Sequence, residues 1–352
     1  MSPQLPNSVQ ILGANGKPLA ETAHYAASKS VKEFRSWNPL LESADAELLP
    51  EQDTLSARSQ DLIRNNGFAQ SGEQATLDNV VGTGLRLSAK PDYRALGRDI
   101  MWAKEWARDV ESKFRAWANT TECDAAGQLN LAGLTRLQFS TAWVQGEALA
   151  LPLWLPDRDK RYATTLQLID PARLSNPQGQ LDSEQFRSGI EFDKFGRPKA
   201  YHIRTTHPGD TFLFNQIMGK WKRVPAKFRF GRKRVIHLYD VRRVGQSRGK
   251  PSLTSIMGDF KMLDHYGRTT LQSAIVNAMV AAFVETPLGP EGIARMFGGD
   301  STKYIQERNE WEGTLQGGSI IPLFPGDKLN GFTPTQPGDA FEPFVSAFLH
   351  KV

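Results

Sequence analysis

Residues 235–286 read VIHLYDVRRVGQSRGKPSLTSIMGDFKMLDHYGRTTLQSAIVNAMVAAFVET, and this stretch decides the fold. Its first residues are mostly β-branched or aromatic and predict a short strand, which the glycines and the proline of residues 245–251 then end. No proline interrupts residues 253–285, which therefore predict one helix of 33 residues, roughly 50 Å long. Helices of globular proteins average about 11 or 12 residues, so a helix of this length favours an assembly scaffold over an active site.

The predicted helix changes character along its length. Its first half carries an apolar stripe at helical spacing, formed by Leu253, Ile256, Met257, Phe260 and Leu263. Its second half, residues 274–284, is small and apolar nearly all round, which favours close packing against neighbouring helices. A membrane span is the alternative, but 11 residues before the acidic Glu285 fall short of the roughly 20 that a bilayer crossing needs. We therefore expect no membrane partner.

The composition of the 352-residue chain is that of a globular protein with two or three domains. Its N-terminus lacks the basic and apolar regions of a secretory signal, and its single cysteine, Cys123, fits a reducing compartment. Glu122 and Asp124 flank this cysteine and are expected to raise its pKa, so a nucleophilic thiol is not expected.

The positive charge is concentrated in one stretch. Residues 220–250 contain twelve Lys or Arg and one acid, Asp240, which gives +11, so with a net charge of +5 the rest of the chain sums to −6. A solvated or subunit-bridging segment is favoured over a DNA reader, because no nucleic-acid-binding motif accompanies the charge. The candidate inter-subunit or DNA contacts are Lys222, Arg223, Arg232, Lys233, Arg234, Arg242, Arg243 and Arg248.

The rest of the chain predicts an α+β protein in several parts. We expect an extended arm over residues 1–50, helices over 51–146, a β-rich part over 147–250 with a hairpin loop at 193–198, and a loop-rich module over 286–340 with a helical insert at 301–311 and a strand at 319–324. Residues 341–352 carry the apolar spacing of an amphipathic helix. This last pattern stops without a cap or a polar tail, which predicts a chain truncated relative to its natural length.

Catalytic patterns are weak throughout the sequence. The six histidines are scattered, with none of the spacings of HExxH or CxxC, and there is no GxSxG. The partial glycine pattern VVGTG, residues 80–84, is better explained by a turn between a helix and a strand than by phosphate binding. Carboxylates do not cluster as a two-metal nuclease site requires. We expect no enzyme activity, no cofactor and no metal.

Several motifs, in order along the chain, resemble those of the portal proteins of tailed bacteriophages, specifically the lambda-type family. They are RSWNP at 35–39, LIRNNGFA at 62–69, VVGTGLRLS at 80–88, IDPARLSNP at 169–177, GQSRGKP at 245–251, FKMLDHY at 260–266, LQSAIVNAMVAA at 271–282 and PGDKL at 325–329. The resemblance runs from about residue 30 to the C-terminus. It is therefore far more specific than any one of these motifs.

The resemblance implies a portal architecture. Residues 51–250 would be the wing, 252–285 the first stem helix, 286–340 the clip and 341–352 the start of a returning stem helix, while the tunnel loop and the crown of the family are absent. Polar side chains of the stem would face the channel or a neighbouring stem; the candidates are Asp259, Asp264, Arg268, Gln272 and Asn277.

The resemblance also implies a function and partners. Portal subunits form a homo-oligomeric ring, typically a dodecamer, at one capsid vertex, and double-stranded DNA passes through it during packaging and ejection without sequence readout. Further expected partners are the terminase large subunit, the major capsid and scaffold proteins and a head-tail adaptor, with the protein in the virion and, during assembly, in the host cytoplasm. On this view the basic stretch pairs with acidic surfaces of adjacent subunits instead of lining the channel.

Two other classes remain open at this point. Another phage connector or adaptor protein would share the ring, but would normally be much smaller and lack both the β-rich part and the long helix. A DNA-processing enzyme would need clustered carboxylates around a metal, and would cleave DNA in the presence of divalent cations.

Overall fold

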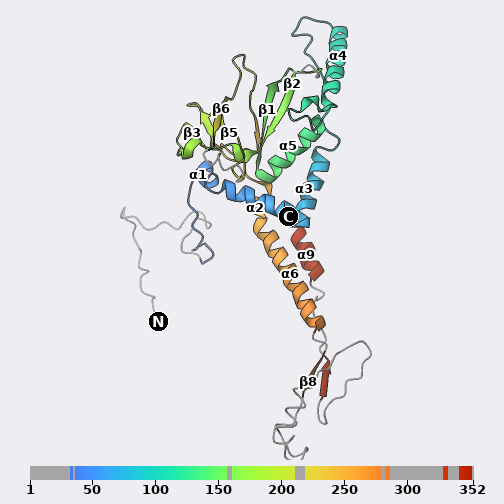
Figure 1. The fold of residues 1–352 in the computed structure, drawn as a ribbon, viewed down its shortest axis with the longest axis vertical. Coiled ribbons are helices and arrows are strands. Elements are labelled where there is room, and N and C mark those ends of the chain that lie inside the picture. Colours follow the sequence, from blue (N-terminus) through green and yellow to red (C-terminus); the bar gives the residue numbers. More distant parts are fainter. Residues whose placement is uncertain are drawn as a thin grey trace, which may run out of the picture.

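The computed structural model describes residues 32–34, 36–156, 161–210, 219–279, 282–285, 328–331 and 341–350. These residues form a body of helices and sheets from which one helix, α6, projects away (Figure 1). The mixed class of helix and sheet is confirmed.

Five helices come first along the chain: α1 (Ala44–Leu48), α2 (Gln52–Asn65), α3 (Gly67–Val80), α4 (Ile100–Ala118) and α5 (Leu131–Gln145). Polar caps fix where four of them begin, since the side chains of Ser43, Asn66, Asp99 and Asn130 accept backbone N–H groups at the starts of α1, α3, α4 and α5. Helix α1 lies inside the segment predicted to be extended, whose residues 1–31 lie outside the described residues. A turn follows α3, as predicted at residues 80–84, but the strand expected after that turn does not form.

Two antiparallel sheets follow. The first has the order β2-β1-β7, with β1 Glu147–Trp154, β2 Thr164–Ile169 and β7 Ile236–Tyr239; the second has the order β3-β4-β5-β6, with β3 Phe186–Arg187, β4 Ile190–Phe192, β5 Pro198–Arg204 and β6 Trp221–Pro225. The loop predicted at residues 193–198 does join two paired strands, and Asp193 accepts backbone N–H groups from Phe195 and Arg197 across it. Both sheets contribute to one core, through Leu149, Ile190 and Val224 among others.

Short 3₁₀ helices link these elements: η2 Thr121–Cys123, η3 Pro171–Arg173, η4 Pro177–Gly179 and η6 Ser252–Ser255. The last of them leads directly into α6, which runs over Met257–Met279.

The prediction of one helix through residue 285 is wrong. Helix α6 has 23 residues, about 35 Å at helical rise, and Ala282–Glu285 form strand β8, which pairs with β9 (Lys328–Gly331) beyond the end of the helix (Figure 1). Phe283 is aromatic and Val284 is β-branched, and both residue types favour strands. The residues before them are apolar nearly throughout, so the spacing of apolar residues cannot distinguish a helix from a strand there.

The root of α6 is packed into the body, whereas its lower part is not. Leu253, Met257 and Phe260 join Leu62 and Ala69 of α2 and α3 in a second buried cluster. Buried side chains continue to Leu263, after which the described residues of α6 are exposed or half-buried. The C-terminal helix α9 (Phe341–Leu349) lies beside α6, with the rings of Tyr266 and Phe344 4.8 Å apart. The helical insert and the strand predicted within residues 286–340 lie outside the described residues.

Candidate assembly surfaces and the buried joint at the root of α6

The polar candidates on α6 do not form one cluster. Asp264 and Arg268, one turn apart, form an ion pair of 3.1 Å between carboxylate and guanidinium. Asp259 is half-buried nearer the body, and Gln272 is exposed further along. Asn277 lies in the last turn of α6, and its side chain is outside the described part of the structure.

Apolar side chains on the projecting part of α6 are left uncovered by the described residues of their own chain. Leu271 and Ile275, one turn apart on one face, are 63% and 51% exposed. The contact with α9 uses a different face, through Tyr266. A projecting helix with an uncovered apolar face is typical of a segment that packs against another chain.

The basic stretch is dispersed over several environments and is not one continuous surface. Arg223 on β6 binds Glu191 through two hydrogen bonds, with Nε 2.7 Å and Nη2 2.6 Å from the carboxylate oxygens. Its neighbour Lys222 is exposed, and so are Arg232 and Lys233 in the loop after β6. The guanidinium of Arg234 lies over the ring of Phe228, 5.3 Å from its centre.

The arginines after β7 are held within the same chain. Arg242 pairs with Asp240 on the surface. Arg243 forms an ion pair with Glu47 of α1 and donates a hydrogen bond of 2.7 Å to the carbonyl of Glu42. Arg243 therefore ties the segment that leads into α1 to the body.

Arg248 is a correction to the predicted basic surface. Its side chain is 5% exposed, and its Nε lies 2.7 Å from Oε1 of Glu147, a carboxylate that is itself fully buried. The same guanidinium donates to the carbonyls of Pro171, Leu174 and Ser188. Because its guanidinium is buried and bound to Glu147 and to three carbonyls, Arg248 is not part of the exposed basic surface.

Glu147 is the centre of a buried polar joint that the sequence analysis missed. His237 Nε2 lies 2.9 Å from Oε2, Gln52 donates to Oε1 at 3.1 Å, and the backbone N–H of Gly249 donates to Oε2 at 3.1 Å. Burial by itself would raise the pKa of this carboxyl, but Arg248 and His237 lower it to about 2. The joint links α2, strands β1 and β7 of the first sheet, and the segment that enters α6.

Two glycines make the close approach at this joint possible. Gly146 has φ +92°, and a Cβ there would collide with the backbone of Lys250 and Pro251. A Cβ on Gly249 would collide with the carbonyl group of Gly146. The signal that sequence reasoning could have used is Glu147 itself, because a lone acid at the start of an apolar strand needs a buried partner.

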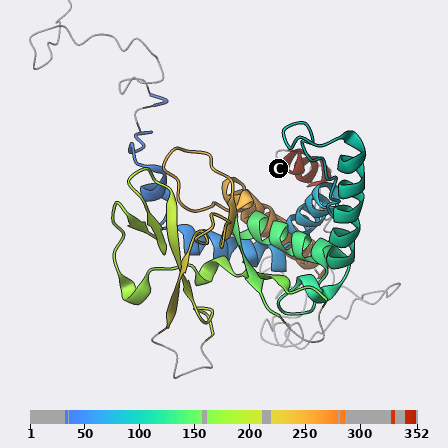
Figure 2. The same ribbon diagram turned by 90° about the horizontal axis from the view of Figure 1, so that it is seen from above.

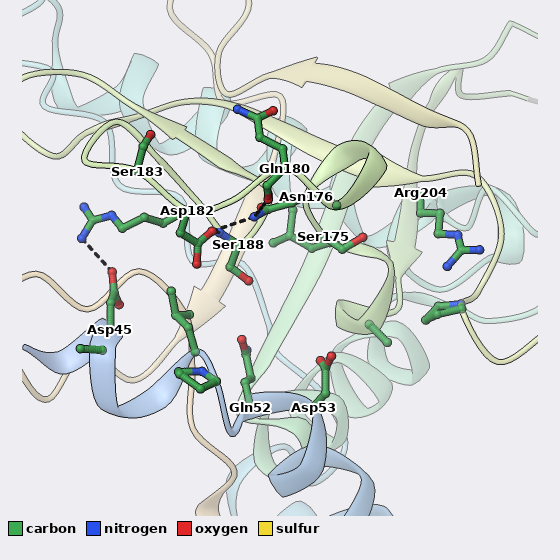
Figure 3. Close-up of a pocket in the computed structure, with 18 of the residues that line it drawn as sticks. Asp45, Gln52, Asp53, Ser175, Asn176, Gln180, Asp182, Ser183, Ser188 and Arg204 are labelled. Carbon is green, nitrogen blue, oxygen red and sulfur yellow. Dashed lines mark hydrogen bonds and ion pairs between the residues drawn. The ribbon is translucent and has the colours of Figure 1, made fainter. Parts of the chain in front are cut away.

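An open hollow of about 810 Å³ lies between α1, α2 and the second sheet (Figure 3). Asp45 pairs there with Arg187 at 2.8 Å, and Asp182 accepts a hydrogen bond of 2.7 Å from Asn176. Asp45 also accepts the backbone N–H of Ser247, next to Arg248. Asp45 therefore holds α1 against the second sheet and against the segment that leads to Arg248.

Reactive groups are sparse in the described ranges. They contain no group of three or more His, Cys, Asp or Glu side chains placed to hold a metal ion. Burial, and then the charge of Asp124, raises the pKa of the Cys123 thiol, in the direction expected from its flanking acids. No helix within the described residues has the length and apolar character needed to cross a membrane.

The comparisons with known proteins place this architecture among the phage portal proteins. A family model for the lambda family of phage portal proteins matches residues 31–352. The chain therefore belongs to the lambda family of phage portal proteins, whose members are structural components of the phage particle. The predicted family is confirmed.

Individual relatives agree with this assignment. The chain is 31% identical over 365 residues to portal protein B of Escherichia phage lambda, covering 99% of this chain and 67% of the relative. It is 30% identical over 335 residues to the portal protein of Escherichia phage N15, covering 91% of this chain and 62% of that protein. The chain thus spans less than two thirds of the N15 protein.

Solved structures that match parts of the chain come from a gene transfer agent. The neck of its empty particle, computed with C6 symmetry, matches with a TM-score of 0.42 and 10% identity over 83% of this chain and 67% of that chain. The neck of the native particle, computed with C12 symmetry, matches with a TM-score of 0.39 and 12% identity over 83% of this chain and 66% of that chain.

Proposed function

We propose that this chain is the subunit of a closed ring, a dodecamer, at one vertex of a phage capsid, and that double-stranded DNA passes through the ring during packaging and ejection. The observation that carries this proposal is the family match over residues 31–352. The projecting helix α6, with its uncovered apolar side chains, supports it physically, because neighbouring copies of such a helix can cover one another in a ring.

The parts of the subunit follow from this assignment. Residues 51–250 act as the wing, η6 and α6 as the first stem segment, and residues 286–340 as the clip, to which β9 belongs and which β8 precedes. Residues 341–352 act as the start of the second stem helix. Asp259, Asp264, Arg268, Gln272 and Asn277 then face the channel or a neighbouring stem. A channel of this kind lets the duplex slide, because sparse charges hold phosphates weakly and read no bases.

The partners follow from the same position. The ring docks the terminase large subunit during packaging and a head-tail adaptor afterwards, and it contacts the major capsid and scaffold proteins in the virion shell. Within the ring, the exposed basic residues Lys222, Arg232 and Lys233 pair with acidic surfaces of adjacent subunits. The protein works mechanically, without breaking a covalent bond of the DNA.

Electron microscopy of the purified chain tests the proposal. We expect rings with a central hole, and native mass spectrometry should give the mass of twelve subunits. Monodisperse monomers over a wide range of concentration would count against it. Cleavage of duplex DNA by the purified protein with Mg²⁺ would instead indicate a DNA-processing enzyme.

The basic residues have a separate test. Reversing the charge of Arg232 and Lys233 to Glu should weaken ring assembly, with the exposed Lys194 and Lys199 reversed in a control variant that assembles normally. If the rings persisted and only DNA retention changed, the basic residues would contact DNA and not a neighbouring subunit.

A further inference from the structure

The segment that leads into α1 presents apolar side chains to solvent. Trp37, Leu40 and Leu41 are 66%, 79% and 102% exposed, and we call residues 36–41 the strap. The strap has no regular secondary structure: residue 36 lies in a turn, and residues 37–41 belong to neither a helix nor a strand. Three large apolar side chains exposed so close together are unusual unless another surface covers them.

The strap is firmly attached at its C-terminal end. Ser43 caps α1 through the backbone N–H of Ala46, and Arg243 holds both the carbonyl of Glu42 and the carboxylate of Glu47. The exposed side chains therefore leave the body from a fixed point. A segment held in this way loses less conformational entropy when it binds than a free tail would lose.

A hollow lies between α4, the residues before it and the start of α5. This cleft of about 570 Å³ is lined by residues 83–87, α4 and Leu131–Ala132, with charged and apolar side chains side by side, and we call it the α4 cleft. Leu85 and Leu87 are 71% and 40% exposed there, with Phe114 and Ala118 among the α4 residues that line it. Of the 19 residues of α4, Ala103 alone is buried, so the described chain leaves the apolar stripe of this helix only partly covered.

The strap and the α4 cleft lie on opposite sides of the body. In both views α1, which the strap precedes, is on one side and α4 on the other (Figures 1 and 2). One subunit therefore cannot fill its own cleft. In a closed ring every contact joins one face of a subunit to a different face of the next subunit. The strap and the α4 cleft lie on two such different faces.

We propose that the strap of one subunit docks into the α4 cleft of the neighbouring copy, with Trp37, Leu40 and Leu41 covering Leu85, Leu87 and the exposed edge of α4. The proposal rests on the ring proposed above and specifies one of its lateral contacts. Repeated once per subunit, the contact buries apolar surface around the whole ring.

Disulfide trapping between separate subunits tests this contact. A subunit carrying Leu41→Cys and a second carrying Leu85→Cys are co-expressed, assembled and oxidised, and a two-subunit product is expected on a denaturing gel. Neither variant alone should give it, because the native Cys123 is fully buried. A disulfide needs Cβ atoms about 4 Å apart, so the product reports direct contact. Leu181→Cys in place of Leu41→Cys is the matched control, being 86% exposed but outside the strap.

A second variant tests the contribution of the strap to assembly. Trp37→Ala, Leu40→Ala and Leu41→Ala together should lower the fraction of rings at least tenfold at a fixed subunit concentration, while the thermal midpoint of the monomer stays unchanged. Leu181→Ala should leave the ring fraction unchanged. Rings that form without the cross-link between positions 41 and 85, or a cross-link from Leu41→Cys subunits alone, overturn this contact but leave the ring intact as a proposal. An unmodified chain that forms no rings overturns both.

Discussion

The guanidinium of Arg248 and the carboxylate of Glu147 form an ion pair with almost no access to solvent, and this pair lies where the chain passes from the sheets into α6. Taking two charges out of water is costly, and here the cost is offset by neighbouring hydrogen bonds from His237, Gln52 and backbone groups. The pair therefore fixes the position from which α6 leaves the body.

Replacing Arg248 by Met should destabilise the subunit strongly. The change leaves the Glu147 carboxylate buried without its cation, and such a loss costs about 3–5 kcal/mol. Urea unfolding of the variant measures the change in free energy. Arg242→Met is the control, because its pair with Asp240 is exposed and is worth at most about 1 kcal/mol. Equal effects of the two substitutions would show that the buried pair is dispensable.

Stability should fall in mild acid. The pKa of Glu147 is about 2 in the folded protein, below its ordinary value of 4.5, and hydrogen bonds from Arg223 and His202 lower the pKa of Glu191 to about 2 as well. A lowered folded-state pKa gives stability that is complete above about pH 4.5 and is lost as the pH falls towards about 2. Unfolding free energies measured across this range should show the decrease, and Glu191→Gln should make the decrease shallower. A stability independent of pH below about 4.5 would contradict the assignment.

Alanine at Gly146 should be much more harmful than at an open glycine. Gly196, with φ +75° and no atom near its missing Cβ, reports the conformational cost alone, about 1 kcal/mol. At Gly146 the collision with Lys250 and Pro251 lowers the free energy of unfolding by about 1–3 kcal/mol more. Thermal unfolding of Gly146→Ala and Gly196→Ala gives the comparison, and equal midpoints would show that the backbone can move aside.

Polar substitutions on the projecting part of α6 should affect assembly and not the folding of the subunit. Leu271→Ser with Ile275→Ser removes apolar side chains that nothing covers within the described subunit, so the thermal midpoint of the monomer should change little. Light scattering should show fewer rings, because the neighbouring stem loses its apolar contact. Thr269→Ala, exposed on the same helix and not among the proposed stem contacts, is the control. Normal rings from the double variant would show that this face of α6 is not an interface.

The sequence predicts the buried root of α6 but not its far end. Leu253, Met257 and Phe260 recur at helical spacing, and this period alone identifies the face that packs against α2 and α3. Residues 282–285 misled the prediction because their strand partner, β9, lies more than 40 positions further along the chain. Local apolar character cannot reveal such a distant pairing.

The function of individual charges was predictable only in part. Counting twelve Lys and Arg in residues 220–250 treats them as equivalent, although the fold buries Arg248 and directs Arg243 to α1. The acid that pairs with Arg248 is 101 residues away, so no local pattern connects them. The sequence analysis did not single out the strap, because only the fold shows that Trp37, Leu40 and Leu41 are exposed.

The back-to-back glycines at positions 146 and 249 also have a mechanical consequence. The two backbones are in contact there, and the carboxylate of Glu147 binds the segment of Gly249. The junction between α6 and the body is therefore expected to be rigid and not to act as a hinge. A pull along the axis of α6 is transmitted to β1, which hydrogen bonds with strands on both edges. Force applied at the tip would then tilt the subunit as a whole before it bent the junction.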